Sequence, residues 1–233
     1  SFERMRGFFV ASDFEARGLP GPDELALLEP LRAQLPPQVF TQPVPLPSVT
    51  RLELDSGQTL RDHLRRARDL LAEAGWRYRD GALRNAQGQA FTLEFLDSGG
   101  GMGRVVTPIQ NNLRRLGIES SYRVIDFALL QQRLDRFDFD VISTRWLGSE
   151  APGAELLDRF GSAAAATEGS SNLIGVRDPA VDALLDRAVA ARTRPELVAT
   201  LRALDRVLRH QHLVIPHWFG STHRIAYRAG RFE

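Results

Sequence analysis

Apolar and polar residues follow regular periods along most of the chain. From residue 59 to 75, Leu and Ala residues recur every three or four positions, which predicts a helix with Gly75 as its C-terminal cap. Beyond it, three stretches predict strands and alternate with two helical stretches: FTLEFL (91–96), RVVTPIQNNLRRLG (104–117), SYRVI (121–125), DFALLQQRLDRF (126–137) and FDVISTRWL (139–147). This alternation predicts parallel strands joined by right-handed crossovers.

The last third of the chain predicts two helices and two strands. The helix from residue 178 begins with Asp178 as N-cap, and the next begins with a capping box of Thr193 and Glu196. LVIPHWF (213–219) and HRIAYR (223–228) predict late strands that close the sheet antiparallel, because their link is too short for a crossover. The predicted fold class is α/β, with a mixed, partly parallel sheet flanked by helices.

The first 55 residues differ from the rest in their proline content. Eight of the thirteen prolines lie within residues 20–47, around one predicted helix, PDELALLEPLRAQL (22–35). The spaced prolines that follow this helix favour an extended, semi-rigid segment. We therefore expect residues 1–55 to be an arm that packs on an α/β ligand-binding lobe formed by residues 56–233, as one structural domain.

Composition excludes several classes of protein. The 30 basic residues are all Arg, and 29 acidic residues balance them to a net charge of +1. Most of the arginines alternate with acidic residues, which favours solvated helix faces over a nucleic-acid-binding stripe. There is no Cys, so disulfides, thiol nucleophiles and thiolate zinc sites are excluded. No apolar run reaches membrane-spanning length, so we expect no direct membrane span.

A glycine cluster between the first strand and its helix, SGGGMGR (98–104), suggests a phosphate loop. It lacks the glycine spacing of a dinucleotide fingerprint and the Gly-Lys-Ser/Thr end of a P-loop. The loop nevertheless follows the carboxyl end of a predicted parallel strand, where open α/β sheets bind ligands. Arg104 is a candidate contact for an anionic group, and the alternative is a flexible turn with a surface arginine.

Trp146 is the stronger candidate for a ligand contact. It ends the third predicted strand, where an aromatic ring can form the floor of an apolar pocket. Leu147, Ser149 and Glu150 follow it and can supply orienting contacts, whereas the alternative for Trp146 is a core position. Asn172 either hydrogen-bonds a peptide-like ligand or stabilises a turn.

Catalytic and metal chemistry find little support in the sequence. His210, His212, His217 and His223 cluster without the spacing or carboxylates of a metal site. Ser162 and Ser171 lack the surroundings of a nucleophile, and strand-end acids explain Asp138 and Asp140 better than a catalytic dyad does. We expect no enzyme activity, no metal and no cofactor.

Six segments in this order resemble the carboxyl-terminal part of the family 5 extracellular solute-binding proteins, the oligopeptide and dipeptide receptors of ABC importers. The segments are GLPGPDELALLEP, ARDLLAEAGW, IQNNLRRLGI, FDFDVISTRW, NLIGVRDPAVDALLDRA and ALDRVLRHQHLVIPHW. Within the family, the chain is most similar to the branch associated with peptide and microcin C uptake. The resemblance spans nearly the whole chain.

The resemblance implies the second lobe of a type II periplasmic binding protein fold. It implies a periplasmic substrate-binding component of an ABC importer, which forms one wall of a peptide-binding cleft and meets the permease subunits. The first lobe and the signal peptide are then expected outside this chain. A receptor for a non-peptide solute such as a metal chelate is one alternative, and an enzyme domain for a phosphorylated substrate is another.

The resemblance also assigns roles to single residues. Trp146 matches the tryptophan of the cleft-lining strand in peptide-binding members. The aspartate that follows it in many of them is absent, and Glu150 is the candidate substitute. Asn172 and Asp182 match an asparagine and an aspartate of the family near the late helix, and the place of Asp182 in the first turn of that helix indicates a structural role.

Overall fold

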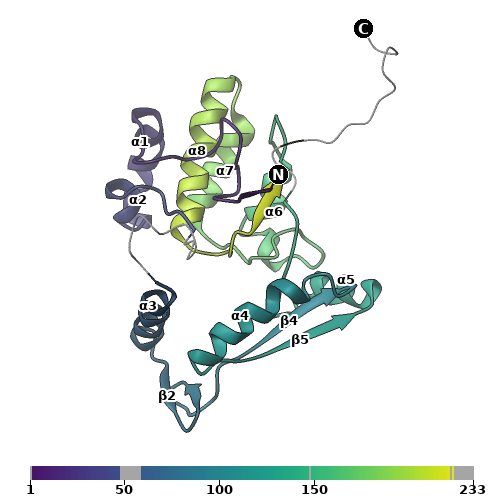
Figure 1. Cartoon of the computed structure of the whole chain (residues 1–233). Helices are drawn as coiled ribbons and strands as arrows, with labels where there is room; N and C mark the ends of the chain where they lie inside the picture. Colours follow the sequence, from purple (N-terminus) through teal and green to yellow (C-terminus); the bar gives the residue numbers. More distant parts are fainter. Residues whose placement is uncertain (1, 48–58, 147, 221, 223–233) are drawn as a thin grey trace, which may run out of the picture. The chain divides into compact units, whose positions relative to one another are not determined.

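The computed structural model describes residues 2–47, 59–146, 148–220 and 222, and it divides the chain into two units (Figure 1). Unit 1 combines Ser1–Pro47 with Trp146–Glu233, and unit 2 is Ser48–Arg145. The expected division, an arm of residues 1–55 on a lobe of residues 56–233, therefore differs from the observed one. The arm contacts the late helices, whereas the parallel strands form a unit of their own.

Unit 2 is built on a parallel three-stranded sheet of order β5-β4-β6. β4 (Thr92–Ser98) pairs along its whole length with β5 (Glu119–Ile125), and with only the two residues of β6 (Val141–Ile142). α4 (Gly103–Arg115) and α5 (Phe127–Asp135) are the crossovers, which confirms the predicted alternation. Figure 1 shows α4 beside β4 and β5. β6 ends four residues before Trp146, so the prediction that Trp146 ends this strand is wrong.

Two further elements of unit 2 follow from local sequence signals. α3 (Leu60–Glu73) begins at a capping box between Thr59 and Asp62, and Gly75 takes a φ of 91° after its end. The hairpin of β2 (Arg77–Arg79) and β3 (Ala82–Arg84) turns at Asp80 and Gly81, which both have positive φ. Asp-Gly suits this turn because both of its central residues must adopt the left-handed conformation.

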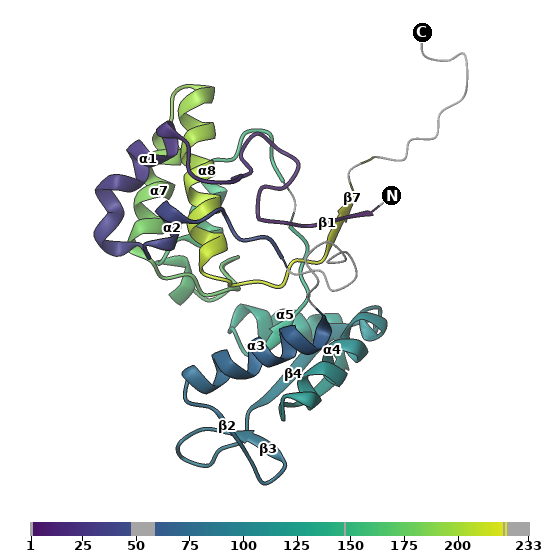
Figure 2. The same ribbon diagram turned by 60° about the vertical axis from the view of Figure 1, so that its left-hand side comes forward.

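Unit 1 surrounds one long helix, α8 (Arg194–His210), whose inner residues are buried. Three helices pack against it: α7 (Pro179–Ala190), α1 (Pro22–Leu28) and α2 (Gln38–Thr41). α6 (Glu155–Phe160) packs on α7 (Figures 1 and 2).

The helix predicted over residues 22–35 is an α-helix only up to Leu28 and continues as the 3-10 helix η1 (Glu29–Gln34). Pro30 explains the change, because it has no N–H to continue the α-helical ladder. A short 3-10 helix, η3 (Ala164–Ala166), follows α6.

Three charged side chains of α8 are buried and bind the arm; we call Asp205, Arg206 and Arg209 the α8 polar seam. Arg206, which is 0% exposed, donates from Nε to a Glu24 carboxylate oxygen at 2.8 Å and from Nη1 to the carbonyl of Gly18 at 2.7 Å. A buried ion pair persists when further hydrogen bonds satisfy both partners. The pair therefore fixes α1 on α8.

Asp205 and Arg209 bind other parts of the arm. The Asp205 carboxylate accepts the N–H groups of Phe8 at 3.1 Å and Ala16 at 3.0 Å. Arg209 donates to the carbonyls of Ala16 at 3.1 Å and Pro45 at 2.5 Å, and it lies 3.3 Å from Asp205. Burial raises the pKa of Asp205, and Arg209 and the two N–H groups oppose that rise. The seam thus satisfies backbone groups in the parts of the arm that lie outside its strand and helices.

The late strands do not close the parallel sheet as predicted. β7 (Trp218–Gly220) pairs antiparallel with β1 (Phe2–Arg4) in a separate two-stranded sheet, visible in Figure 2. The observed partner of β7 is the start of the arm, a pairing that the sequence did not predict. HRIAYR (223–228) lies outside the described residues.

No helix in the described part of the chain combines the length and hydrophobicity needed to cross a membrane.

Gly7→Ala is expected to destabilise unit 1, because a Cβ at this position would lie 2.8 Å from Cδ of Arg209 and 2.9 Å from Oδ1 of Asp205. We expect a loss of about 1–3 kcal/mol in the free energy of unfolding, measured by urea denaturation. Gly148→Ala is the matched control, since nothing lies within 4 Å of the added Cβ. Equal stability of the two variants would contradict the described fit of arm and seam.

Candidate functional site

The residues predicted to contact a ligand fall into both units. Arg104 belongs to unit 2, whereas Trp146, Ser149, Glu150 and Asn172 belong to unit 1. Leu147 lies outside the described residues.

Trp146 packs at the edge of the core of unit 1. Its ring stacks on Phe160 with 6.1 Å between centroids and meets Phe8 edge-on at 5.3 Å. The guanidinium of Arg159 lies 5.8 Å from the ring. Trp146 is only partly buried, yet its indole N–H is inaccessible and finds no hydrogen-bond partner among the residues that the structure describes. The ring contacts place Trp146 against the core, as its alternative interpretation expects, and its role as a ligand contact stays a prediction.

The polar residues after Trp146 form an exposed loop that is attached to α8. Arg194 at the start of α8 donates a hydrogen bond to the carbonyl of Glu150 and pairs with Asp13 at 3.3 Å. The Ser149 hydroxyl accepts the N–H of Ala151 at 3.2 Å. The backbone of Glu150 is thereby held, and its side chain lies on the exposed surface.

Asn172 is fully buried, and among the described residues its side chain binds only backbone groups. Its Nδ2 donates to the carbonyls of Gly161 at 2.9 Å and Val176 at 3.0 Å, and its Oδ1 accepts the N–H of Val176 at 3.0 Å. This network supports the turn-stabilising alternative for Asn172. Asp182 accepts the N–H of Ser162 at 2.8 Å, which fits the structural role expected for it.

The glycine loop of unit 2 is supported by two side chains that the sequence analysis did not select, Asp97 and Tyr122. The Tyr122 hydroxyl donates to Oδ2 of Asp97 at 2.5 Å, and the same oxygen accepts the N–H of Met102 at 3.3 Å. Burial, followed by the hydrogen bond to Asp97, raises the pKa of Tyr122. Asp97 lies near the carboxyl end of β4, whereas Tyr122 is the central residue of the neighbouring parallel strand β5, so only the position of Asp97 gave a sequence signal.

This arrangement weakens the phosphate hypothesis. In a phosphate-binding loop, backbone N–H groups point at the ligand. Here the N–H of Met102 already binds the carboxylate of Asp97. Arg104 is exposed in the first turn of α4 and has no hydrogen bond or ion pair with another described residue of the chain.

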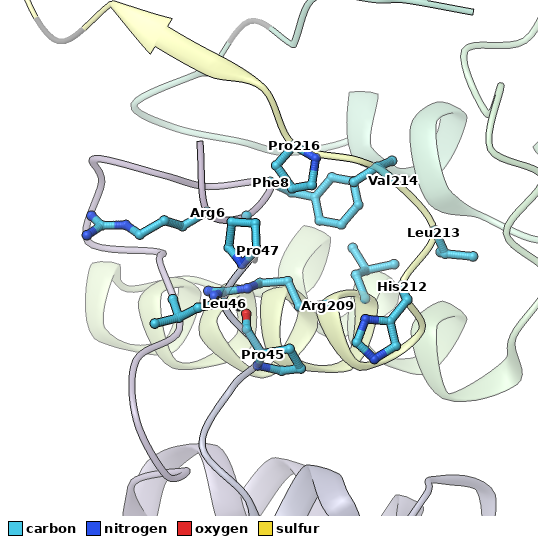
Figure 3. A pocket seen from close by; sticks show the side chains of 12 residues that line it. Arg6, Phe8, Pro45, Leu46, Pro47, Arg209, His212, Leu213, Val214 and Pro216 are labelled. Carbon is cyan, nitrogen blue, oxygen red and sulfur yellow. Dashed lines mark hydrogen bonds between the residues drawn. The ribbon is translucent and has the colours of Figure 1, made fainter. Parts of the chain in front are cut away.

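A small cavity of about 100 Å³ lies elsewhere in unit 1 (Figure 3). The arm, the Pro45–Pro47 segment and the residues after α8 line it, and none of the predicted ligand contacts does. Arg6, Arg209 and His212 supply its charged or polar side chains, and Phe8, Leu213 and Val214 are among its apolar ones. Its size suits a few water molecules rather than a peptide.

The histidines and acidic residues form no metal site in the part of the chain that the structure describes, where no group of three potential ligands occurs. Asp138 pairs with Arg133 at 3.0 Å, and Asp140 accepts the N–H of Glu94 at 2.8 Å. His210 is partly buried, and its Nε2 has no hydrogen-bond partner within the described part of the chain. Burial, then the charges of Arg206, His212 and Arg209, lowers the pKa of His210 to about 4.

The fold belongs to the type II periplasmic binding class. The chain resembles the solved structure of the oligopeptide-binding protein AppA from Bacillus subtilis in complex with a nonapeptide, with a TM-score of 0.60 and 22% identity. That match covers 66% of this chain and 31% of AppA. NikZ from Campylobacter jejuni, in complex with Ni(L-His), gives a TM-score of 0.58 at 16% identity and covers 93% of this chain and 46% of NikZ.

The family follows from sequence. The model of the bacterial extracellular solute-binding proteins, family 5 Middle, matches residues 31–168, and the chain belongs to this family. The probable peptide-binding protein YejA of Agrobacterium fabrum is 40% identical over 97% of this chain and 36% of its own length. The chain thus spans about a third of the length of the curated relatives it matches.

Asn172→Ala is expected to lower the free energy of unfolding by about 3 kcal/mol, because it leaves buried backbone groups without partners. Chemical denaturation measures the loss. Ser171→Ala is the matched control, since this neighbouring side chain is exposed. If Asn172→Ala has the same free energy of unfolding as the control, the structural role of Asn172 is contradicted, and a ligand contact is again the better hypothesis for this residue.

The depressed pKa of His210 predicts a pH-dependent stability. The His210 side chain binds a proton less readily in the folded protein than in the unfolded chain. Its contribution to the free energy of unfolding is therefore greatest above about pH 6.5 and decreases as the pH falls towards 4. His210→Asn should flatten this slope in urea titrations at pH 4.5–7.5. His63→Asn, in unit 2, should preserve it, and an unchanged slope in His210→Asn would contradict the assignment.

Proposed function

We propose that this chain is part of a periplasmic substrate-binding component of an ABC importer and forms one wall of a peptide-binding cleft. Its membership of family 5 carries the proposal. The proposed ligand agrees with the peptide-binding name of the Agrobacterium relative and with the nonapeptide held by AppA. The proposed partners are a peptide or peptide-like ligand and the permease subunits, and the role is non-enzymatic.

The proposed ligand contacts are those that the sequence selected, without Asn172. Trp146 offers the exposed part of its ring to an apolar group of the ligand. Ser149 and Glu150, with Leu147 between them and Trp146, offer polar contacts from a loop whose backbone Arg194 holds. Arg104 offers donors to peptide carbonyl oxygens. Such contacts suit peptides, because backbone donors and acceptors repeat regardless of side chain.

A non-peptide cargo such as a metal chelate is the second candidate. The Ni(L-His) complex of NikZ supports it, because that protein shares the fold. Mass spectrometry of ligands that co-purify with the full-length protein distinguishes the two cargoes. A phosphorylated substrate is disfavoured, because Asp97 already occupies the loop amide of Met102.

Trp146→Leu in the full-length protein is expected to weaken binding of the co-purified ligand at least about tenfold, because the ring loses its contact with that ligand. Isothermal titration calorimetry measures the affinity. Trp218→Leu in β7 is the matched control, because this tryptophan is exposed and lies outside the proposed contacts.

The 233-residue chain alone should bind much more weakly than the full-length protein, because it spans about a third of the length of its relatives. Submicromolar peptide binding by this chain alone would contradict the single-wall proposal. An unchanged affinity of Trp146→Leu would remove Trp146 from the contacts.

A further inference from the structure

A bonded pair of side chains, Asp97 and Tyr122, lies under the glycine loop of unit 2. Asp97 is near the end of β4, and Tyr122 lies on the neighbouring strand β5. The 2.5 Å hydrogen bond between them is short, as expected for a hydroxyl that donates to a carboxylate. Both side chains are partly buried, and their hydrogen bond joins two neighbouring strands of the sheet.

The pair holds the loop through backbone groups. Oδ2 of Asp97 accepts the N–H of Met102 at 3.3 Å. The ring of Tyr122 lies beside Gly103, where a Cβ would be 3.5 Å from Cε1. Gly99 and Gly100 take φ values of 86° and 73°, a conformation that glycine adopts without strain. Among the described residues, no atom lies within 4 Å of a Cβ at Gly99 or Gly101, so this part of the chain leaves the outer face of the loop open.

The neighbouring crossover has its own carboxylate. Oδ1 of Asp126 accepts the N–H of Leu129 at 2.9 Å as the N-cap of α5. Met102, the N-cap of α4, has no side-chain acceptor, and the carboxylate there comes from Asp97 five residues earlier. Both loops at this edge thus contain an internal negative charge that repels a second anion at short range.

We propose that Asp97 and Tyr122 are positioning residues of the glycine loop, and that Asp97 fixes its selectivity by excluding anionic groups. The loop then faces neutral parts of a ligand, such as the amides and carbonyls of a peptide backbone, rather than phosphate or carboxylate. The assignment to a peptide backbone rests on the proposed function, whereas the exclusion of anions does not.

Titration of the 233-residue chain with inorganic phosphate tests the exclusion, with calorimetry and thermal shift as measurements. The wild-type chain should show no saturable binding in the millimolar range. Asp97→Asn keeps the size of the side chain and removes its charge, so it should bind phosphate at least about tenfold more tightly. Arg104→Ala in the Asp97→Asn background should reduce this gain, because Arg104 lies in the first turn of α4.

Tyr122→Phe is the matched control. It removes the hydrogen bond to Asp97 but keeps the carboxylate, so it should lower stability without a gain in phosphate binding. Asp97→Ser serves if Asp97→Asn does not fold, and the same gain is expected, because serine offers a neutral acceptor. The proposal is overturned if the wild-type chain binds phosphate as tightly as the folded Asp97 variant, or if Tyr122→Phe gains equally.

Peptide titrations of the full-length protein separate this inference from the proposed function. Loss of affinity in both Asp97→Asn and Tyr122→Phe, at a temperature where both are folded, is expected of positioning residues. Unchanged peptide affinity in both variants would refute the positioning role. A full-length protein that binds no peptide at all would refute the proposed function and leave the phosphate result standing.

Discussion

The central constraint on unit 1 is the burial of three charged side chains on one helix. Asp205, Arg206 and Arg209 cannot stay in the interior unless each finds partners, because desolvating an unpaired charge costs several kcal/mol. The arm supplies these partners, mostly as backbone groups of residues 8–18 and 45. In return, these hydrogen bonds hold the segments of the arm that lie outside its helices and strand against α8. Arm and helix therefore depend on each other.

This dependence explains why unit 1 is discontinuous in sequence. The arm and α8 lie almost 200 residues apart in the chain, as in the pairing of Phe8 with Asp205, yet their polar groups are satisfied only together. Unit 2 relies on a different principle. Its parallel strands and crossover helices are consecutive, and local caps such as Asp126 and the Thr59–Asp62 box set where the helices begin. The two units thus differ in how far apart in sequence their stabilising contacts lie.

The proposed ligand contacts follow the same division. In unit 1 the loop after Trp146 is held by Arg194, a residue of the helix that also anchors the arm. In unit 2 the glycine loop is held by Asp97 and Tyr122 from adjacent strands. Each candidate loop is therefore tied by a hydrogen bond to a helix or to strands of its own unit. Under the proposed function, these loops share a role in solute binding.

The sequence by itself determined the elements whose signals are local. Thr193 and Glu196 marked the start of α8, Asp80-Gly81 marked the hairpin, and the alternation of apolar stretches predicted the parallel strands. The tertiary structure decided which strand pairs with β7, that Asn172 is buried and binds backbone groups, and which side chains hold the glycine loop. These depend on contacts between residues distant in sequence, such as Tyr122 with Asp97, and periodicity carries no information on which distant groups meet. Burial of a polar residue is likewise a property of the packed chain, so Arg206 resembles a surface arginine until its partners are in place.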